Sequence, residues 1–280
     1  MFSTAWGETM IADIDEAIDW LGCAISCDDC AHQDLLAQAR CRLKHACVHD
    51  RYARRIDRFF DWNRDLANRY IDHPYFEVRA IATKRADVFR LPALLSDPDE
   101  TVRWNAVRRL PRRYLLDLRN DPHREVRIRV ATLLDPADLS AMMRDEDYYV
   151  RLVVAHRISS TELPAMITDE EPEVRRVVAG RVEPEALWRM LSDHDADVRL
   201  AVARRLSPVE LIGLHRDADW RVRHEAASRM VPGMLAAMLD DPDEIVRELV
   251  LKRIEAQKDP EFGGNVLPFT AAHKRKPSRR

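Results

Sequence analysis

The chain has 280 residues, of which 46% are hydrophobic and 33% are charged, and its formal net charge at pH 7 is −3. This length allows a sizeable buried core and predicts one large or two small domains. With only 7 glycines against 15 prolines, the composition argues against nucleotide-binding loops or many β-turns and favours helices punctuated by proline.

The N-terminal stretch MFSTAWGETMIADIDEAIDWL has neither the basic start nor the apolar centre of a signal peptide. No later run approaches the roughly 20 apolar residues that span a bilayer. We therefore expect a cytoplasmic protein with no membrane partner. In that compartment thiols stay reduced, so clustered cysteines indicate metal binding or redox chemistry more than disulfides.

All five cysteines lie in one window, CAISCDDCAHQDLLAQARCRLKHAC, at residues 23–47. Thiolates in this number suit an iron-sulfur cube or a tetrahedral zinc ion. The nearby histidines that could replace a thiolate on zinc are His32, His45 and His49. On a continuous helix Cys41 and Cys47 would be rotated by about 240° from each other, so the chain must bend between them.

The next segment, DRYARRIDRFFDW at residues 50–62, predicts an amphipathic helix. Its apolar face would pack the cysteine-rich module against the part of the chain that follows residue 62. Its arginines could also stabilise an anionic cluster.

A 24-residue repeat occupies most of the remaining chain. A Val-Arg pair recurs at every step, at Val78, Val102, Val126, Val150, Val174, Val198, Val222 and Val246. An aspartate stands five residues before each valine, except in the first copy, which has His73. These columns divide residues 71–262 into eight repeats.

Each repeat predicts one helix and one shorter element. We expect Asp97 and Asp241 to be N-caps, each followed by proline at the first helical position. The segments LSPVEL and LDPADL predict a second start, after Ser207 and Asp135. Because only about eight residues remain before the next aspartate, a single α turn or a 3₁₀ piece is expected there.

The helix of the second repeat should turn Val102, Ala106 and Leu110 inward, with Arg103 and Arg108 outward. Stacked repeats of this kind predict an all-α fold, an α-solenoid. The period is too short for armadillo or HEAT units and lacks the strand motif of a standard leucine-rich repeat.

Two arginine columns six residues apart follow the repeat and could contact phosphates. Residues 71–262 nevertheless hold 31 basic and 36 acidic residues, so we expect the arginines to pair with aspartates of adjacent repeats. DHDAD at residues 193–197 imitates half of a calcium loop, but Val198 replaces the required glycine. Nucleotide-binding, zinc-protease and nucleophile-elbow motifs are absent, so we predict no enzyme.

The repeat columns resemble the leucine-rich variant (LRV) repeat proteins, bacterial solenoids whose 24-residue units alternate an α-helix with a 3₁₀ helix. Residues 27–63 resemble the N-terminal module with which some members bind a [4Fe-4S] cluster. The resemblance implies that the cluster ligands and metal ligands are Cys27, Cys30, Cys41 and Cys47, in the pattern C-x₂-C-x₁₀-C-x₅-C. Cys23 would be spare, although ligand sets with Cys23 in place of Cys27 stay open.

The expected organisation is an iron-sulfur module at residues 1–70, eight repeats at 71–262 and a basic, disordered tail at 263–280. The predicted function is a [4Fe-4S] redox or iron-responsive scaffold for an unknown protein partner. The resemblance also implies an accessory role in nitrogen fixation or metallocluster metabolism. The alternative is a nucleic-acid-binding repeat protein with a structural zinc or iron-sulfur site.

Overall fold

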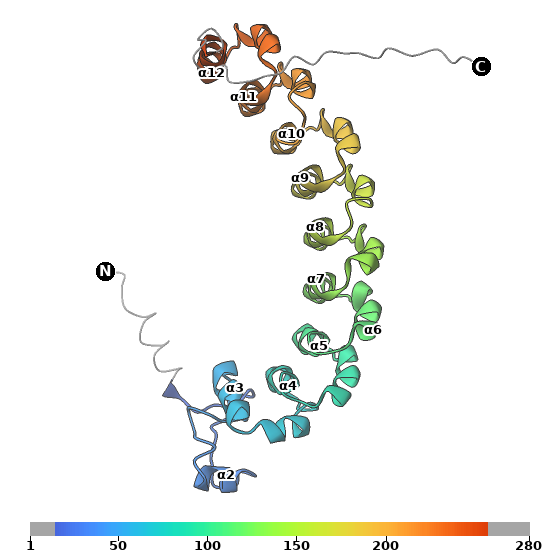
Figure 1. Ribbon diagram of the computed structural model, residues 1–280. Helices are drawn as coiled ribbons and strands as arrows, with labels where there is room; N and C mark the ends of the chain where they lie inside the picture. The colour runs from blue at the N-terminus through green and yellow to red at the C-terminus, as the bar shows by residue number, and fades with distance from the viewer. Residues whose placement is uncertain (1–14, 257–280) are drawn as a thin grey trace, which may run out of the picture. The chain divides into compact units, whose positions relative to one another are not determined.

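A computed structural model describes residues 15–256, and Figure 1 traces its elements. Short α-helices alternate with 3₁₀ helices (η), and the described residues contain two isolated β-bridges but no strand. The fold is therefore all-α, as predicted. None of the helices within residues 15–256 has the length and apolar character to cross a membrane.

The chain divides into two compact units, one ending at Ser159 and the other beginning at Ser160. This division falls inside the predicted solenoid, and the predicted domain boundary at residues 70 and 71 stays a prediction. The predicted tail at 263–280 lies outside the described residues.

The first unit begins with the cysteine-rich segment and continues into the repeats. Its elements are α2 (Gln33–Ala37), α3 (Ala53–Trp62), η1 (Arg64–Arg69), α4 (Phe76–Thr83), η2 (Val88–Ser96), α5 (Glu100–Val107), α6 (Arg112–Leu115), η3 (Leu116–Asn120), α7 (Arg124–Leu133), η4 (Pro136–Met142) and α8 (Tyr148–Arg157).

The described part of the second unit, residues 160–256, consists of repeats. Its elements are η5 (Leu163–Met166), α9 (Pro172–Arg181), η6 (Pro184–Met190), α10 (Ala196–Ala203), η7 (Glu210–Leu214), α11 (Trp220–Arg229), η8 (Pro232–Met238) and α12 (Glu244–Glu255).

The α-helices begin two residues later than predicted. Asp99, not Asp97, is the N-cap of α5, and its carboxylate accepts hydrogen bonds from the second and third helical N–H groups. Likewise Asp243, not Asp241, caps α12. The Asp-Pro pair instead forms the turn before the helix, in which the Asp97 carboxylate accepts the N–H of Asp99 at 2.9 Å.

The short second element of the first seven repeats is a 3₁₀ helix, as predicted, joined in the second repeat by the one-turn helix α6. In η4, Pro136 stands at the start and Asp135 precedes it as N-cap. Before η7, the Glu210 carboxylate accepts the Ser207 N–H at 2.9 Å, which is the reciprocal half of a capping box.

One hydrophobic core joins the cysteine-rich segment to the first repeats. It runs from Leu35 and Cys41 through Phe59 and Phe60 of α3 and continues to Leu110. Both phenylalanines are fully buried, and each side chain contributes roughly 2 kcal/mol by leaving water. Helix α3 therefore docks the module onto the repeats, as its amphipathic pattern predicted.

The first arginine column forms ion pairs between successive repeats. Within the first unit the pairs are Arg79–Asp97, Arg103–Asp121 and Arg127–Asp145. Within the second unit they are Arg175–Asp193, Arg199–Asp217 and Arg223–Asp241. The aspartate pairing is as predicted, but the outward orientation of Arg103 is wrong, because this side chain is buried while Arg108 is exposed.

In the second arginine column Arg85 pairs with aspartates, Asp57 and Asp61 of helix α3, but Arg109 and Arg205 do not follow the predicted aspartate pairing. Arg109 Nη1 donates to the Thr83 and Ala86 carbonyls at 2.7 and 2.6 Å, at the end of helix α4. Arg205 makes the same contacts with Ala179 and Val182. These carbonyls lack partners inside their own helix, so arginine from the next repeat satisfies them.

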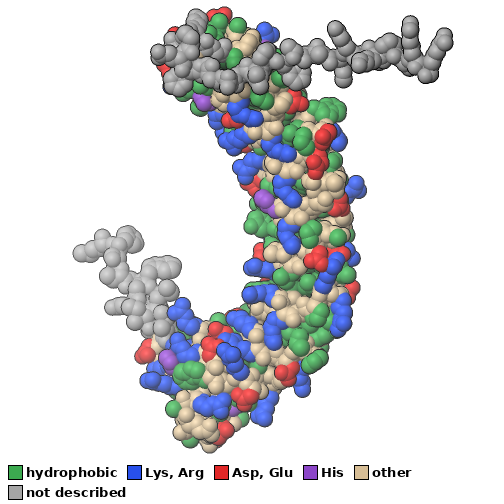
Figure 2. All heavy atoms as spheres, viewed as in Figure 1, with side chains coloured by type: hydrophobic (Ala, Val, Ile, Leu, Met, Phe, Trp, Pro, Cys, Tyr) green, Lys and Arg blue, Asp and Glu red, His purple; other side chains and the backbone are tan. Residues whose placement is uncertain are grey.

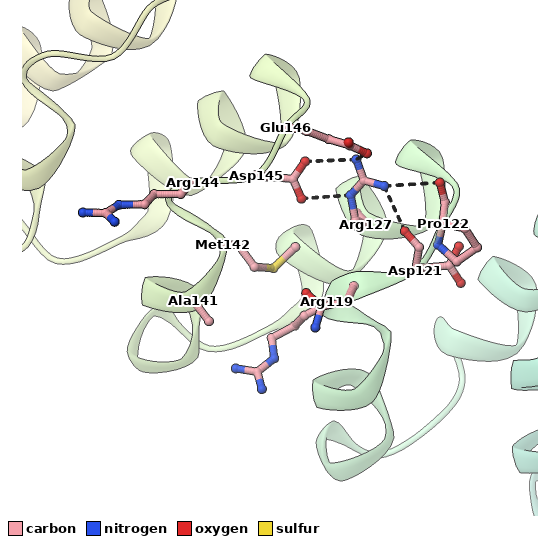
Figure 3. A pocket seen from close by; sticks show the side chains of 10 residues that line it. Arg119, Asp121, Pro122, Arg127, Ala141, Met142, Arg144, Asp145 and Glu146 are labelled. Carbon is pink, nitrogen blue, oxygen red and sulfur yellow. Dashed lines mark hydrogen bonds and ion pairs between the residues drawn. The ribbon is translucent and has the colours of Figure 1, made fainter.

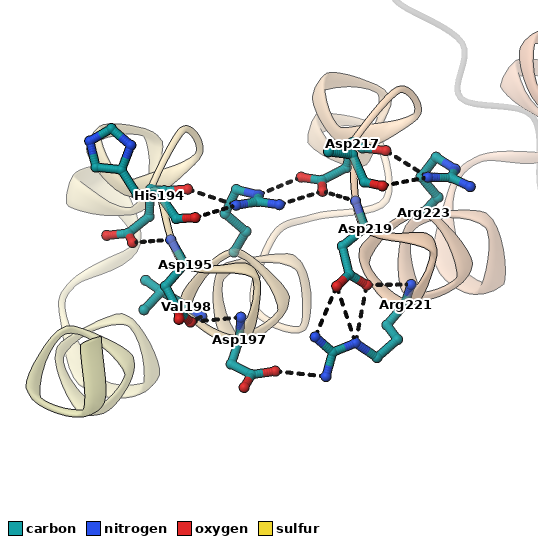
Figure 4. Close-up of polar contacts among 11 residues, drawn as sticks. His194, Asp195, Asp197, Val198, Asp217, Asp219, Arg221 and Arg223 are labelled. Atoms are coloured by element: carbon teal, nitrogen blue, oxygen red, sulfur yellow. Dashed lines mark hydrogen bonds and ion pairs between the residues drawn. The ribbon is translucent and has the colours of Figure 1, made fainter.

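The DHDAD segment in the second unit has a structural role throughout (Figure 4). Asp193 binds Arg175, Asp195 caps α10, and Asp197 pairs with Arg221 at 2.9 Å. The helix-cap interpretation is confirmed for Asp195, and the carboxylates of Asp193 and Asp197 form ion pairs instead.

Candidate metal centre

The five cysteines differ in exposure. Cys41 and Cys47 are buried, Cys27 and Cys30 are partly buried, and Cys23 is exposed. The four predicted ligands therefore include two that reach into the core and two that face its edge.

A tight turn brings Cys41 and Cys47 together. Arg42 and Ala46 form an isolated bridge whose N–H···O distances are 2.9 and 2.8 Å, and Lys44 between them has a φ of 62°. The two cysteines flank this bridge, and their thiols are hydrogen-bonded to each other. The predicted bend therefore exists.

The Cys27–Cys30 pair lies on a second turn, in which the Cys30 N–H donates to the Cys27 carbonyl at 3.4 Å. Helix α2 follows and ends at Ala37, and Ala39, with a φ of 57°, then reverses the chain. The Arg40 N–H then closes the end of the helix on the Leu35 carbonyl at 2.8 Å. This return places Cys41 in the core.

The four predicted ligands act on one another electrostatically. Burial raises the pKa of the Cys27 thiol, and the charges of Cys47 and Cys30 raise it further. The hydrogen bond from the Cys47 thiol lowers the pKa of Cys41 and raises that of Cys47, because Cys47 acts as the donor. A cationic iron centre would relieve this repulsion, so the donor set fits an iron-sulfur cluster.

A cluster of aromatic rings with one partly buried hydrogen bond lies near the thiols. The Tyr70 hydroxyl is hydrogen-bonded to His32 Nε2, and the His32 ring lies 5.4 Å from that of Phe59. Burial and the charges of Cys30 and Cys47 raise the pKa of Tyr70 to about 12. The tyrosine thus faces the thiol group. The sequence analysis missed it, because nothing in the local pattern links residues 32 and 70.

Two buried polar side chains tie the ligand segments to α3. Asn63 Nδ2 donates to the Arg40 carbonyl, next to Cys41, at 2.8 Å. Arg55 Nη1 donates to the fully buried Asp50 carboxylate at 2.9 Å, and the Arg55 carbonyl accepts the Cys47 N–H at 3.3 Å. The sequence analysis gave the arginines of residues 50–62 a role beside an anionic cluster and missed both anchors.

The histidines offered as zinc ligands have other contacts. His32 is bonded to Tyr70, and His45 Nδ1 accepts from Arg58 at 3.0 Å. Within residues 15–256, no group of three or more His, Cys, Asp or Glu side chains is arranged to hold a single metal ion. A cube is held differently, because each thiolate binds its own iron at a separate corner.

A surface hollow of 430 Å³ opens beside Cys30. The residues that line it are Asp19, Trp20, Ile25, Ser26, Asp29, Cys30, Ala31 and His49. It gives Cys30 an open approach that the buried Cys41 and Cys47 do not have.

A second hollow in the first unit, of 350 Å³, belongs to the repeat architecture (Figure 3). Arg127 binds Asp145 there through Nε at 2.8 Å and also contacts Glu146 and the Asp121 carbonyl. The charged side chains of Arg127, Asp145 and Glu146 are therefore already bonded to one another across the repeats.

Comparison with known proteins points to the same two parts. The family described as "LRV protein FeS4 cluster" matches residues 17–69. An uncharacterized 27.7 kDa protein in the nifB 3′ region of Rhodobacter capsulatus is 52% identical over 96 residues, which cover 34% of this chain and 39% of that protein. A solved leucine-rich repeat variant is 40% identical, with a TM-score of 0.78 over 82% of this chain and 98% of its own.

Proposed function

This chain belongs to the leucine-rich repeat variant family and carries its iron-sulfur module, and on that premise we propose that it is a non-catalytic scaffold for a protein partner. The cluster would report redox state or iron supply to the surface of the repeats. We place this activity in the cytoplasm.

We assign the cluster as [4Fe-4S], held by Cys27, Cys30, Cys41 and Cys47. The mutual effects on the pKa values of these thiols support the assignment, as does the exposure of Cys23. A bound cube would supply a one-electron centre. The protein would supply the dry aromatic shell and the anchored ligand segments around it.

The difference in burial among the ligands supports a responsive role. Cys41 and Cys47 hold the module to its core, whereas Cys30 borders the open hollow. A reductant, an oxidant or an iron-scavenging molecule could therefore reach the cluster at the Cys27–Cys30 edge.

The observation that carries the proposal is the shared core. Cys41 belongs to the same hydrophobic cluster as Val78 of α4 and Val102 of α5. Because the packing of these repeats depends on the position of Cys41, loss or change of the cluster would alter the surface that they present. Without the cluster, four thiols in and beside this core would lose the iron that holds them together, and the core would loosen.

The biological setting comes from the Rhodobacter capsulatus relative, whose description places it in the nifB 3′ region. We propose an accessory role in nitrogen fixation or metallocluster metabolism. A thiol-held cluster with an exposed edge suits a protein that monitors iron or electron supply.

The first test is the visible spectrum of anaerobically purified protein, with iron and acid-labile sulfide assayed on the same sample. We expect a broad brown absorption that bleaches with dithionite, with about four irons and four sulfides per chain. A colourless protein that contains one zinc would contradict the cluster assignment.

The second test is hydrogen exchange on the loaded and the cluster-free protein. We expect cluster removal to deprotect α4 and α5, which share the core, and to leave α11 and α12 unchanged. Unchanged exchange in α4 and α5 would contradict the responsive scaffold without affecting the cluster assignment.

A further inference from the structure

Many arginines of the repeats bind carboxylates or backbone carbonyls, but two in the first unit, Arg108 and Arg129, have no such contact in the described part of the chain. Arg108 and Arg129 are exposed and form no ion pair with any residue in the part of the chain that the structure describes. Lys84 is exposed too, and its ammonium lies 3.6 Å from the Asp57 carboxylate. These cations lie on the face of the first unit that carries its α-helices, where Figure 2 shows many Lys and Arg side chains.

Trp104 departs from the repeat pattern in the middle of this group. The corresponding residues of the neighbouring repeats are Ala80 and Ile128, and both are buried. The tryptophan is only partly buried, and the guanidinium carbons of Arg108 and Arg129 lie 5.3 and 4.9 Å from its ring centre. Stacking on the ring restricts both guanidinium groups and leaves their N–H edges available to a ligand.

A hollow of 290 Å³ opens next to the stacked group. Its lining residues are Lys84, Asn105, Arg108 and Arg109, none of which is acidic. Arg109 is held by two carbonyls of the previous repeat, and Asn105 Nδ2 donates to the Ala80 carbonyl at 3.1 Å. Two of the four lining side chains are therefore fixed by hydrogen bonds made inside the protein.

The charge and the size of the hollow define the ligand. Several cations, with Asp57 and Glu77 as counter-charges beside Lys84, call for a multivalent anion, and a phosphate group carries about two negative charges with three strong acceptor oxygens. A guanidinium edge matches two phosphate oxygens at once. The small volume suits one or two phosphate groups, and the arginine columns that could extend such a surface are already bonded to aspartates and carbonyls.

We propose that the hollow formed by Lys84, Asn105, Arg108 and Arg109, with Arg129 stacked on Trp104, is a binding site for a compact phosphate-bearing ligand. The site lies on α4, α5 and α7 and is separate from the thiol group. It does not depend on the proposed function.

A purely structural role for Arg108 must be separated from ligand binding, because cations at helix C-termini are favoured by the helix dipole. Arg204 provides the matched control. It is the C-cap of α10 as Arg108 is of α5, and it is also exposed, but Leu200 stands where α5 has Trp104.

The test is isothermal titration of the full-length, cluster-loaded protein with inorganic pyrophosphate at low ionic strength. We expect one site per chain, with affinity reduced about tenfold by Arg108→Gln and by Arg129→Gln, because each removes charge-assisted hydrogen bonds. Trp104→Leu, which introduces the residue used in α10, should also weaken binding. Arg204→Gln should leave the affinity unchanged.

Absence of pyrophosphate binding, or equal losses in Arg108→Gln and Arg204→Gln, would overturn the site. A parallel titration with a single-stranded DNA oligonucleotide separates the two sources of phosphate. Tighter, strongly salt-dependent binding of the oligonucleotide that Arg108→Gln abolishes would overturn the compact ligand in favour of a nucleic-acid backbone.

Discussion

Arg103 and Asp121 form a buried two-point ion pair that fastens the second repeat to the third. Arg103 Nε and Nη2 each donate to a different carboxylate oxygen at 2.8 Å. Its Nη1 donates to the Asp97 carbonyl, also at 2.8 Å, so that one guanidinium joins a turn of its own repeat to the next. The same geometry recurs along both units, which makes it the main polar connection between repeats.

Replacing Arg103 with glutamine should destabilise the protein by about 3 kcal/mol, because Asp121 would remain buried with an uncompensated charge. The measurement is urea unfolding followed by circular dichroism. Asp197→Asn is the control, since it removes an ion pair whose side chains are about half exposed, and should change the midpoint little. Equal effects of the two substitutions would show that the buried ion pair contributes no more to stability than the exposed one.

The aspartates of these pairs predict acid sensitivity. Burial alone would raise the pKa of Asp241, but hydrogen bonds from Arg223 and the Asp243 N–H lower it below its usual value. An unfolded aspartate titrates near about 3.9, so this stabilisation is present above that pH and is lost as the pH falls through the lower folded pKa. Urea midpoints measured between about pH 6 and pH 3 should therefore decrease at the acid end.

Asp241→Asn should be less stable than the wild type at neutral pH and should show a weaker acid dependence. Comparing the two proteins at each pH removes any contribution from acid loss of the cluster, which both share. A parallel decline of both curves would contradict the assignment of this sensitivity to the ion pair.

The repeat architecture was predictable because its columns recur in register. Aspartate and arginine at fixed phase predicted pairing between repeats, and the short interval after each helix predicted a 3₁₀ piece. The cap position was not predictable at Pro98 and Pro242, since an aspartate stands on each side of these prolines and only the folded turn decides which of the two binds arginine. We expected the second arginine column to bind aspartates as the first does, because a sequence does not reveal which backbone carbonyls lack a partner.

The site was only partly predictable, because several of its contacts form only in the folded chain. The spacing of Cys41 and Cys47 required a bend, and the structure contains one. Three residues of the site were missed because they act through partners distant in sequence or through burial: Tyr70, Asn63 and Asp50. A single sequence carries no local signal of either property. The ligand set itself stays a prediction.

Single replacement of Cys27, Cys30, Cys41 or Cys47 by alanine should abolish cluster retention, because each thiolate is assigned to one iron. Cys23→Ala should retain the cluster, since that side chain is exposed and spare. Iron content and the visible spectrum of anaerobically purified variants provide the measurement. Loss of the cluster in Cys23→Ala together with its retention in Cys27→Ala would reverse the assignment of these two residues.

Ala39→Gly should stabilise the module by about 1 kcal/mol, because Ala39 has a left-handed φ of 57° that costs an L-residue with a side chain. Ala37→Gly, in the last turn of α2, is the control and should destabilise, since glycine lowers helix propensity there. The readout is the thermal midpoint of the loaded protein. A lower midpoint for Ala39→Gly would show that the chain reversal does not strain Ala39.

Tyr70→Phe should shorten the lifetime of the cluster in air. The substitution keeps the ring that packs on Phe59 and Phe60 but leaves His32 Nε2 without its partner in a position where only 8% of the residue is exposed. An unsatisfied buried group costs about 1 kcal/mol or more, so the segment between Cys30 and α2 should open more often. The rate of bleaching near 400 nm after exposure to oxygen measures this opening, with the exposed Tyr149→Phe as control. An unchanged rate, with normal iron content, would mean that the Tyr70–His32 bond does not protect the centre.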